Sequence, residues 1–153
     1  EEYPSWLYEV NMGATTVWER WNSVLPNGKI SGTGMNSLNH YAYGAVAEWM
    51  YQTMCGIQPD ETAPGFKKAI LAPKPDQRLS FVKGSYHSAC GIYRLNWEQK
   101  GEEIQFEVEI PFDCEAVFLV PEGMRINVIN GVEMEEKESI LLGKGIYRMI
   151  GRW

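Results

Sequence analysis

The sequence has 153 residues, a length that suits one ordinary domain or a small domain joined to part of another. Hydrophobic residues make up 44% and charged residues 22%, which is typical of a folded globular protein and argues against long disordered stretches. The net charge of −6, with no basic run longer than Lys67-Lys68, argues against a nucleic-acid partner, and no apolar run of 18 residues suggests a membrane span.

The first expected element is a short helix over 5–12 that ends at Gly13, and the most informative motif follows it. The run Gly-Ala-Thr-Thr-Val-Trp-Glu-Arg-Trp at 13–21 places Glu19 between Trp18 and Trp21. An apolar wall would favour the protonated carboxyl, whereas pairing with Arg20 would favour the ionised form. Such opposed influences recur at carboxylates that act as acids or bases. The residues alone support a second interpretation equally well. In it, Glu19 and Arg20 form an exposed ion pair beside two core tryptophans.

A glycine-rich loop over 26–36 leads into the one long helix that the sequence predicts, over 38–55. Ser37 is the expected N-cap and Gly56 the C-terminal stop. Apolar residues at three- and four-residue steps make one face of this helix wide. The helix therefore needs neighbours from a longer parent chain or a second molecule, and an uncovered face would invite homo-oligomerisation. His40 falls in the first turn, where a histidine taken alone is more often a structural hydrogen-bonder than a catalytic residue.

After Pro64 the pattern changes to short segments of alternating polarity. A clear example is 104–110, where apolar and polar residues alternate as in a half-buried antiparallel strand. Turn signals such as Lys100-Gly101 and Asn130-Gly131 separate the segments. The pattern predicts an antiparallel β-sandwich. The expected strands cover 66–71, 79–85, 92–97, 104–110, 116–120, 125–129 and 145–150.

The cysteines and acidic residues indicate no metal or cofactor. Cys55, Cys90 and Cys114 match no zinc or redox spacing, and we expect buried free thiols, with a Cys90–Cys114 pair across a sheet as the alternative. The acidic run over 133–138 has no defined ligand geometry and is interpreted as a solvated turn or strand edge.

Several of these runs resemble glycoside hydrolase family 78, the bacterial α-L-rhamnosidases. They are the motif at 13–21 and the run Met-Asn-Ser-Leu-Asn-His-Tyr-Ala-Tyr-Gly-Ala-Val at 35–46. Shorter pieces at 56–60, 64–66 and 72–75 also fit, so the resemblance covers about half of the chain in the right order. It implies a mixed α and β chain, in which 1–58 is the end of an (α/α)6 six-hairpin glycosidase barrel and 59–153 is a C-terminal β-sandwich.

The resemblance also implies a reaction, the inverting hydrolysis of terminal α-L-rhamnose from a glycoside or polysaccharide. Glu19 would be the general base that activates water, while His40, Trp18 and Trp21 would contribute to substrate binding, the tryptophans either packing around the sugar or holding Glu19. The general acid would lie upstream, so we expect these 153 residues alone to be inactive and the rest of the parent chain to be a required partner. The chain opens at Glu1 without an initiator Met, which we interpret as a cut from a longer protein, so localisation stays open between cytoplasm and periplasm.

The alternative function is a non-catalytic β-sandwich that binds carbohydrate or has a purely structural role. Sugar binding would need exposed aromatic side chains, and the candidates are Trp97, Tyr86 and Tyr93. Most of these alternate inward with Ile92 and Leu95, which weakens that alternative. A structural role, with the sandwich supporting the barrel, is compatible with the enzyme hypothesis.

Overall fold

The structure is a computed structural model that describes residues 2–32 and 34–153. Internal contacts divide the chain into two units. The first unit is Glu1–Ala47 and the second is Glu48–Trp153. Each unit is described by itself below. The boundary expected after residue 58 stays a prediction; the strand that contains it, β1 (Ile57–Pro59), pairs with a strand of the second unit.

The first unit contains one short α-helix and a long irregular segment. Helix α1 (Trp6–Asn11) begins after Ser5, whose Oγ accepts a hydrogen bond from the Tyr8 backbone N–H at 3.1 Å. Gly13 follows with a φ of 82°, a left-handed conformation that glycine adopts without strain. The short helix expected over 5–12 is therefore confirmed.

The helix predicted over 38–55 is shorter and less regular than expected. Its first turn is a 3-10 segment, η1 (Ala42–Ala45), followed by α2 (Val46–Trp49) and a π-helical segment, η2 (Met50–Cys55). Ser37 does not cap it. Residues 37–40 are not helical because their backbone groups bond elsewhere: the carbonyls of Ser37 and Leu38 accept hydrogen bonds from residues of the 13–21 motif. The predicted stop is confirmed, since Gly56 has a φ of 89°.

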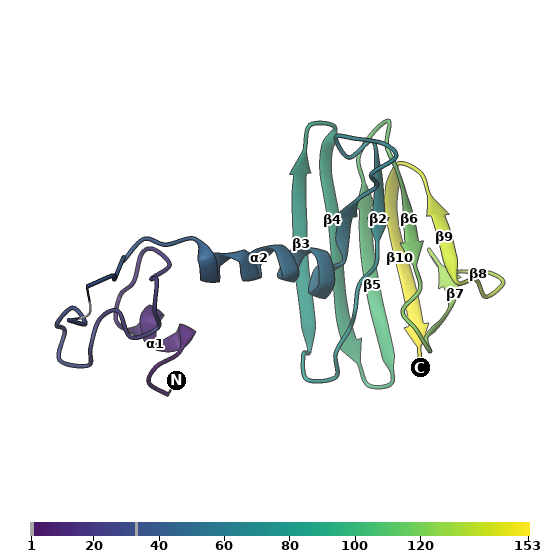
Figure 1. Cartoon of the computed structure of the whole chain (residues 1–153). Helices are drawn as coiled ribbons and strands as arrows, with labels where there is room; N and C mark the ends of the chain where they lie inside the picture. Colours follow the sequence, from purple (N-terminus) through teal and green to yellow (C-terminus); the bar gives the residue numbers. More distant parts are fainter. Residues whose placement is uncertain (1, 33) are drawn as a thin grey trace. The chain divides into compact units, whose positions relative to one another are not determined.

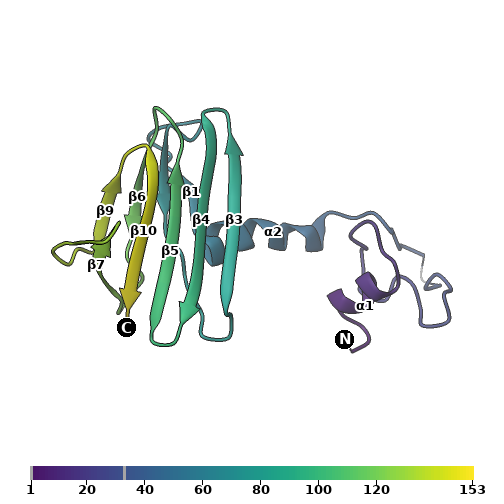
Figure 2. The same cartoon turned by 180° about the vertical axis from the view of Figure 1, so that it is seen from behind.

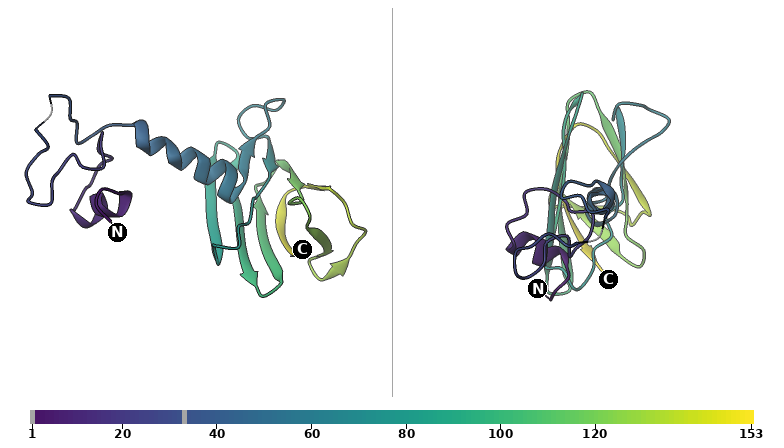
Figure 3. Two further views of the ribbon diagram at one scale, coloured as in Figure 1. Left: turned by 60° about the horizontal axis from the view of Figure 1, so that its bottom comes forward. Right: turned by 60° about the vertical axis from the view of Figure 1, so that its left-hand side comes forward.

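The second unit is a β-sandwich of two sheets that pack face to face (Figure 1, Figure 2 and Figure 3). The four-stranded sheet has the order β1-β2-β6-β9 and the six-stranded sheet has the order β3-β4-β5-β10-β7-β8. The strands after β1 are β2 (Lys68–Leu71), β3 (Phe81–Ser88), β4 (Gly91–Lys100), β5 (Glu103–Ile110), β6 (Glu115–Leu119), β7 (Arg125–Ile129), β8 (Val132–Glu133), β9 (Ser139–Leu142) and β10 (Gly145–Arg152).

All seven predicted strands are present, with shifted ends, but one pairing differs from the antiparallel expectation. β2 and β6 are parallel, with Ala69 opposite Ala116. A parallel pair needs a long crossover, and here the chain between the two strands builds β3, β4 and β5 in the other sheet. Strands β1, β8 and β9 were not predicted.

The core lies between the two sheets and is continuous. Trp97, Tyr93, Phe106 and Phe118 are among its largest fully buried side chains. The rings of Phe106 and Phe118 meet edge to face across the sheets, 5.3 Å apart. Burial of such rings is the main source of sandwich stability, since each removes a large apolar area from water.

Two further expectations can be compared with the structure. Asn130 and Gly131, with φ of 51° and 79°, form the two-residue hairpin turn between β7 and β8 that their sequence predicts.

The three cysteines are free; Cys55 and Cys114 are buried and Cys90 is half-buried. None of the helices in the described ranges is long and apolar enough to cross a membrane.

Candidate functional site

The candidate site is built where the 13–21 motif lies beside the segment 35–40. Hydrogen bonds join the two segments along their length. The backbone N–H of His40 donates to the Val17 carbonyl at 2.8 Å, and that of Glu19 donates to the Ser37 carbonyl at 2.9 Å. The Thr16 hydroxyl donates to the Leu38 carbonyl. Two motifs that are about twenty residues apart in sequence are thus brought together.

The Glu19 side chain is held by the facing segment. Its Oε2 accepts a hydrogen bond from the Ser37 backbone N–H at 2.7 Å. This hydrogen bond holds the carboxyl group of Glu19, and the bond from the Glu19 N–H to the Ser37 carbonyl holds its backbone. In the described residues no hydrogen bond occupies Oε1, and the side chain is only partly buried. Glu19 therefore has one oxygen held by the facing segment and a second that no hydrogen bond among the described residues occupies.

Arg20 has a different partner on the same segment. Its guanidinium donates a hydrogen bond to the Met35 carbonyl, and its own backbone is tied to Ser23, which is fully buried. Glu19 and Arg20 thus contact two separate points of the facing segment. The role of Glu19 as an acid or base stays a prediction.

His40 follows the same segment and is half-buried. Its Nδ1 accepts a hydrogen bond from the Ala42 backbone N–H at 3.3 Å, and its ring stacks on Tyr41 with 5.4 Å between centroids. When Nδ1 is an acceptor, the neutral ring carries its proton on Nε2. The other edge of the ring can then donate a hydrogen bond to a ligand hydroxyl.

The two tryptophans of the motif have different environments. Trp18 is 5% exposed and packs inside the first unit, whereas Trp21 is 38% exposed and stacks on Tyr43 with 5.1 Å between ring centroids. Only Trp21 presents an accessible aromatic face. Which of the two roles left open by the sequence each tryptophan has stays a prediction.

The structure adds residues that the sequence did not point to. Ser37 was expected as a helix cap and is instead the backbone partner of Glu19. Asn36 donates its amide to the carbonyls of Ser23 and Ser31, joining the loop to the motif. Glu9, on α1, is almost completely buried. A glutamate in a short helix carries no sequence signal for burial, and backbone partners are not visible in a sequence at all.

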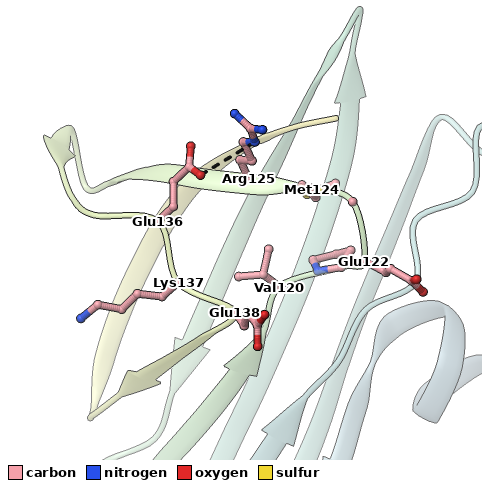
Figure 4. A pocket seen from close by; sticks show the side chains of 9 residues that line it. Val120, Glu122, Met124, Arg125, Glu136, Lys137 and Glu138 are labelled. Carbon is pink, nitrogen blue, oxygen red and sulfur yellow. Dashed lines mark ion pairs between the residues drawn. The ribbon is translucent and has the colours of Figure 1, made fainter.

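A hollow of about 600 Å³ lies at one end of the sandwich (Figure 4). Its carboxylates do not converge: Glu136 pairs with Arg125 at 3.8 Å, and Glu122 points away from Glu138. No aromatic face lines it. It therefore lacks both the paired acids of a glycosidase and a platform for a sugar ring.

Throughout the part of the chain that the structure describes, no group of three or more histidine, cysteine, aspartate or glutamate side chains is arranged to hold a metal ion.

Two family models match the chain. The bacterial alpha-L-rhamnosidase 6 hairpin glycosidase domain matches residues 1–54, and the bacterial alpha-L-rhamnosidase C-terminal domain matches residues 56–134. The second match covers more than half of the chain.

Relatives and solved structures agree with these matches. An alpha-L-rhamnosidase of Alteromonas sp. (strain LOR) is 43% identical over 79% of this chain and 13% of its own length. One of Formosa agariphila is 36% identical over the whole of this chain and 18% of its own length. The crystal structure of the Streptomyces avermitilis alpha-L-rhamnosidase complexed with L-rhamnose is similar over 97% of this chain and 15% of its own, with 30% identity and a TM-score of 0.76. The chain thus spans less than a fifth of the length of the relatives it matches.

Proposed function

Because the chain belongs to the bacterial α-L-rhamnosidase family, we propose that it is part of an enzyme that removes terminal α-L-rhamnose from glycosides or polysaccharides. The substrate class rests on similarity to relatives named alpha-L-rhamnosidases, one of them crystallised with L-rhamnose. The activity belongs to a longer chain, since these residues correspond to less than a fifth of such proteins. Residues 1–58 would complete its barrel and 59–153 would form its sandwich.

In this proposal Glu19 is the general base of an inverting hydrolysis. The observation that carries it is the hydrogen bond from the Ser37 N–H to Glu19 Oε2, which sets the direction of the carboxyl group. The free Oε1 then takes a proton from the water that attacks the anomeric carbon. An inverting enzyme keeps its two carboxyl groups roughly 6.5–9.5 Å apart so that this water fits. The general acid would come from the rest of the barrel.

His40 and Trp21 are proposed to bind the sugar. His40 Nε2 would donate to a ring hydroxyl, because Nδ1 is already occupied by the Ala42 N–H. Trp21 would offer its exposed ring face to the apolar side of the rhamnose, which carries a methyl group. Trp18 would act indirectly, by packing behind Glu19.

The proposed mechanism needs no cofactor, since protonation of the leaving oxygen and activation of water are both carboxyl chemistry. It does need both carboxyl groups. The 153 residues alone would have the base without the acid, so we expect them to be inactive. Loss of one partner removes a contribution of about 10²–10⁴ in rate.

A carbohydrate-binding sandwich is the weaker candidate. Trp97 and Tyr93 are fully buried, so the expectation that either could be an exposed sugar platform is wrong. They face inward because their strand alternates, and Trp97 Nε1 donates to the Met54 carbonyl at 3.0 Å. Tyr86 is 39% exposed but stacks on Phe66, 4.3 Å between centroids.

The test compares the parent protein with its Glu19→Gln variant on p-nitrophenyl α-L-rhamnoside. We expect the parent to cleave this substrate and the variant to lose activity by about 10²–10⁴ while rhamnose still binds. Glu61→Gln, at an exposed turn of the sandwich, is the matched control and should keep full activity. An active Glu19→Gln variant would show that Glu19 is only a structural residue.

A further inference from the structure

The outer face of the six-stranded sheet carries a polar hollow of about 490 Å³ across β3, β4, β5 and β10. Its floor is the backbone of Trp97, Phe106 and Met149, whose side chains point the other way and are buried in the core. In Figure 2 these four strands lie nearest the viewer, with the other sheet behind them. The volume is within the range of small-ligand sites. We call this feature the outer-face hollow.

The strand register places four polar side chains in one row across the outer-face hollow. Lys83 on β3 lies opposite Asn96 on β4, which lies opposite Glu107 on β5. Arg148 on β10 lies opposite Glu107 and completes the row. Neighbouring strands are about 4.8 Å apart, so the row is about 14 Å long, which is longer than one sugar ring.

The amide groups of this hollow are free to bind a ligand. Within residues 2–32 and 34–153, the side-chain amides of Asn96 and Gln105 have no hydrogen-bond partner, and Asn96 is half-buried. An amide offers both donors and an acceptor, which suits a hydroxyl group because a hydroxyl also donates and accepts. Phe81 is 56% exposed on the same face, and its ring centroid lies 5.5 Å from Lys83 Nζ. Amides beside an exposed ring are suited to a polyhydroxylated ligand.

The charges of these four strands favour an anionic ligand. Each outward carboxylate on them already lies in an ion pair, and the pairs are Glu98–Lys100, Glu103–Arg152, Glu107–Arg148 and Glu109–Arg94. Lys83 has no carboxylate partner among the described residues. The outer-face hollow therefore has a surplus cation on a chain whose net charge is −6. This surplus is complementary to a carboxylate of a ligand.

We propose that the outer-face hollow binds an acidic oligosaccharide. A carboxylate of the sugar chain contacts Lys83, while its hydroxyl groups form hydrogen bonds with the amides of Asn96 and Gln105. An acidic peptide could also pair with Lys83, but it has few hydroxyl groups to satisfy two amides. The identity of this sugar chain as part of the polysaccharide that loses its rhamnose rests on the proposed function, whereas the binding itself does not. The hollow would hold the chain and take no part in hydrolysis.

The test measures binding of trigalacturonate to the parent protein by isothermal titration calorimetry at low salt. Lys83→Glu places a like charge against the carboxylate and should weaken binding by about tenfold or more. Lys83→Arg keeps the charge and should bind within about threefold of the parent. Asn96→Ala removes a neutral hydrogen-bonding group and should weaken binding by about threefold to tenfold.

Lys137→Glu is the matched control, because it changes the net charge equally on the exposed segment between β8 and β9. We expect it to bind trigalacturonate as the parent does. Absence of binding by the parent, or equal losses in Lys83→Glu and Lys137→Glu, would overturn the inference. Equal affinity for the neutral trimethyl ester of trigalacturonate, or for tetraglutamate, would overturn it as well.

The same proteins are assayed on p-nitrophenyl α-L-rhamnoside, and we expect the Lys83 and Asn96 variants to cleave it at the rate of the parent. A parent that binds trigalacturonate but does not cleave the aryl rhamnoside contradicts only the proposed function. A parent that cleaves the aryl rhamnoside but does not bind trigalacturonate contradicts only the inference about the outer-face hollow.

Discussion

The two units of this chain differ in how well their own residues bury their apolar side chains. In the sandwich, two sheets cover each other and enclose a continuous core that includes Trp97, Phe106 and Phe118. In the first unit, the apolar residues Leu7, Val10 and others that would be expected in a core are more than half exposed. The same unit contains Glu19 and His40.

This difference teaches where stability and chemistry lie. The second unit encloses a continuous core of its own, which is typical of an autonomous domain. The first unit leaves aromatic residues such as Trp21 and Tyr41 exposed. A site at the meeting of several segments suits an enzyme whose barrel is assembled from a much longer chain, and the relatives are indeed more than five times as long.

The largest expected effect comes from substituting two buried tryptophans, one in each unit, and comparing the losses of stability. In the 153-residue chain, Trp97→Ala should lower the free energy of unfolding by about 3–5 kcal/mol, because it empties the centre of the sandwich core. Trp18→Ala should change the same transition by less than about 1 kcal/mol, because Trp18 packs in the other unit. Urea unfolding followed by near-ultraviolet circular dichroism measures both. Equal losses would mean that the two units unfold as one.

A somewhat smaller effect is expected at Gly56, where the helical segment meets β1. A side chain at this residue would place its Cβ 2.2 Å from the Pro73 nitrogen, and φ is 89°. Gly56→Ala should therefore cost about 2 kcal/mol or more. Gly101→Ala is the matched control, since φ is 64° but no atom lies within 4 Å of the added Cβ, and it should cost only about 1 kcal/mol. Similar thermal midpoints for the two variants would contradict the proposed crowding at Gly56.

The smallest effect is a dependence of sandwich stability on alkaline pH. Burial raises the pKa of the Cys55 thiol from 9.0 to about 11. Between these values the unfolded chain releases the proton and the folded chain keeps it, so the free energy of unfolding falls as pH rises from about 9 to about 11. Cys55→Ala should show a smaller fall over this range in urea titrations. An unchanged pH dependence would mean that Cys55 does not titrate as proposed.

Most strands could be predicted from the sequence because their alternation is strong and the core is built on it. The missed strands have weak signals: β1 ends in Pro59, β8 has two residues, and β9 alternates over only Ile140 and Leu142. The parallel pairing of β2 with β6 follows from the crossover and not from either strand's own pattern. Alternation predicts which face is buried, but it does not say which strands are neighbours.

For the candidate site, the sequence pointed to particular residues, whose roles stay predictions, but not to their contacts. Glu19 was identifiable from its aromatic neighbours and from the family resemblance. Its partner Ser37 acts through a backbone N–H, so no side-chain pattern points to it. The same long-range hydrogen bonds explain why 37–40 are not helical despite their propensity, since tertiary contacts override a weak local preference.

The most direct test of the account is chemical rescue of the Glu19→Ala parent enzyme with azide. An inverting enzyme without its base leaves space beside the anomeric carbon, and azide can attack there without deprotonation. We predict that Glu19→Ala is inactive on p-nitrophenyl α-L-rhamnoside and that added azide restores release of p-nitrophenol with β-L-rhamnosyl azide as product. Normal hydrolysis by the variant would contradict the base assignment, and rescue that gives the α-azide would contradict the inverting mechanism.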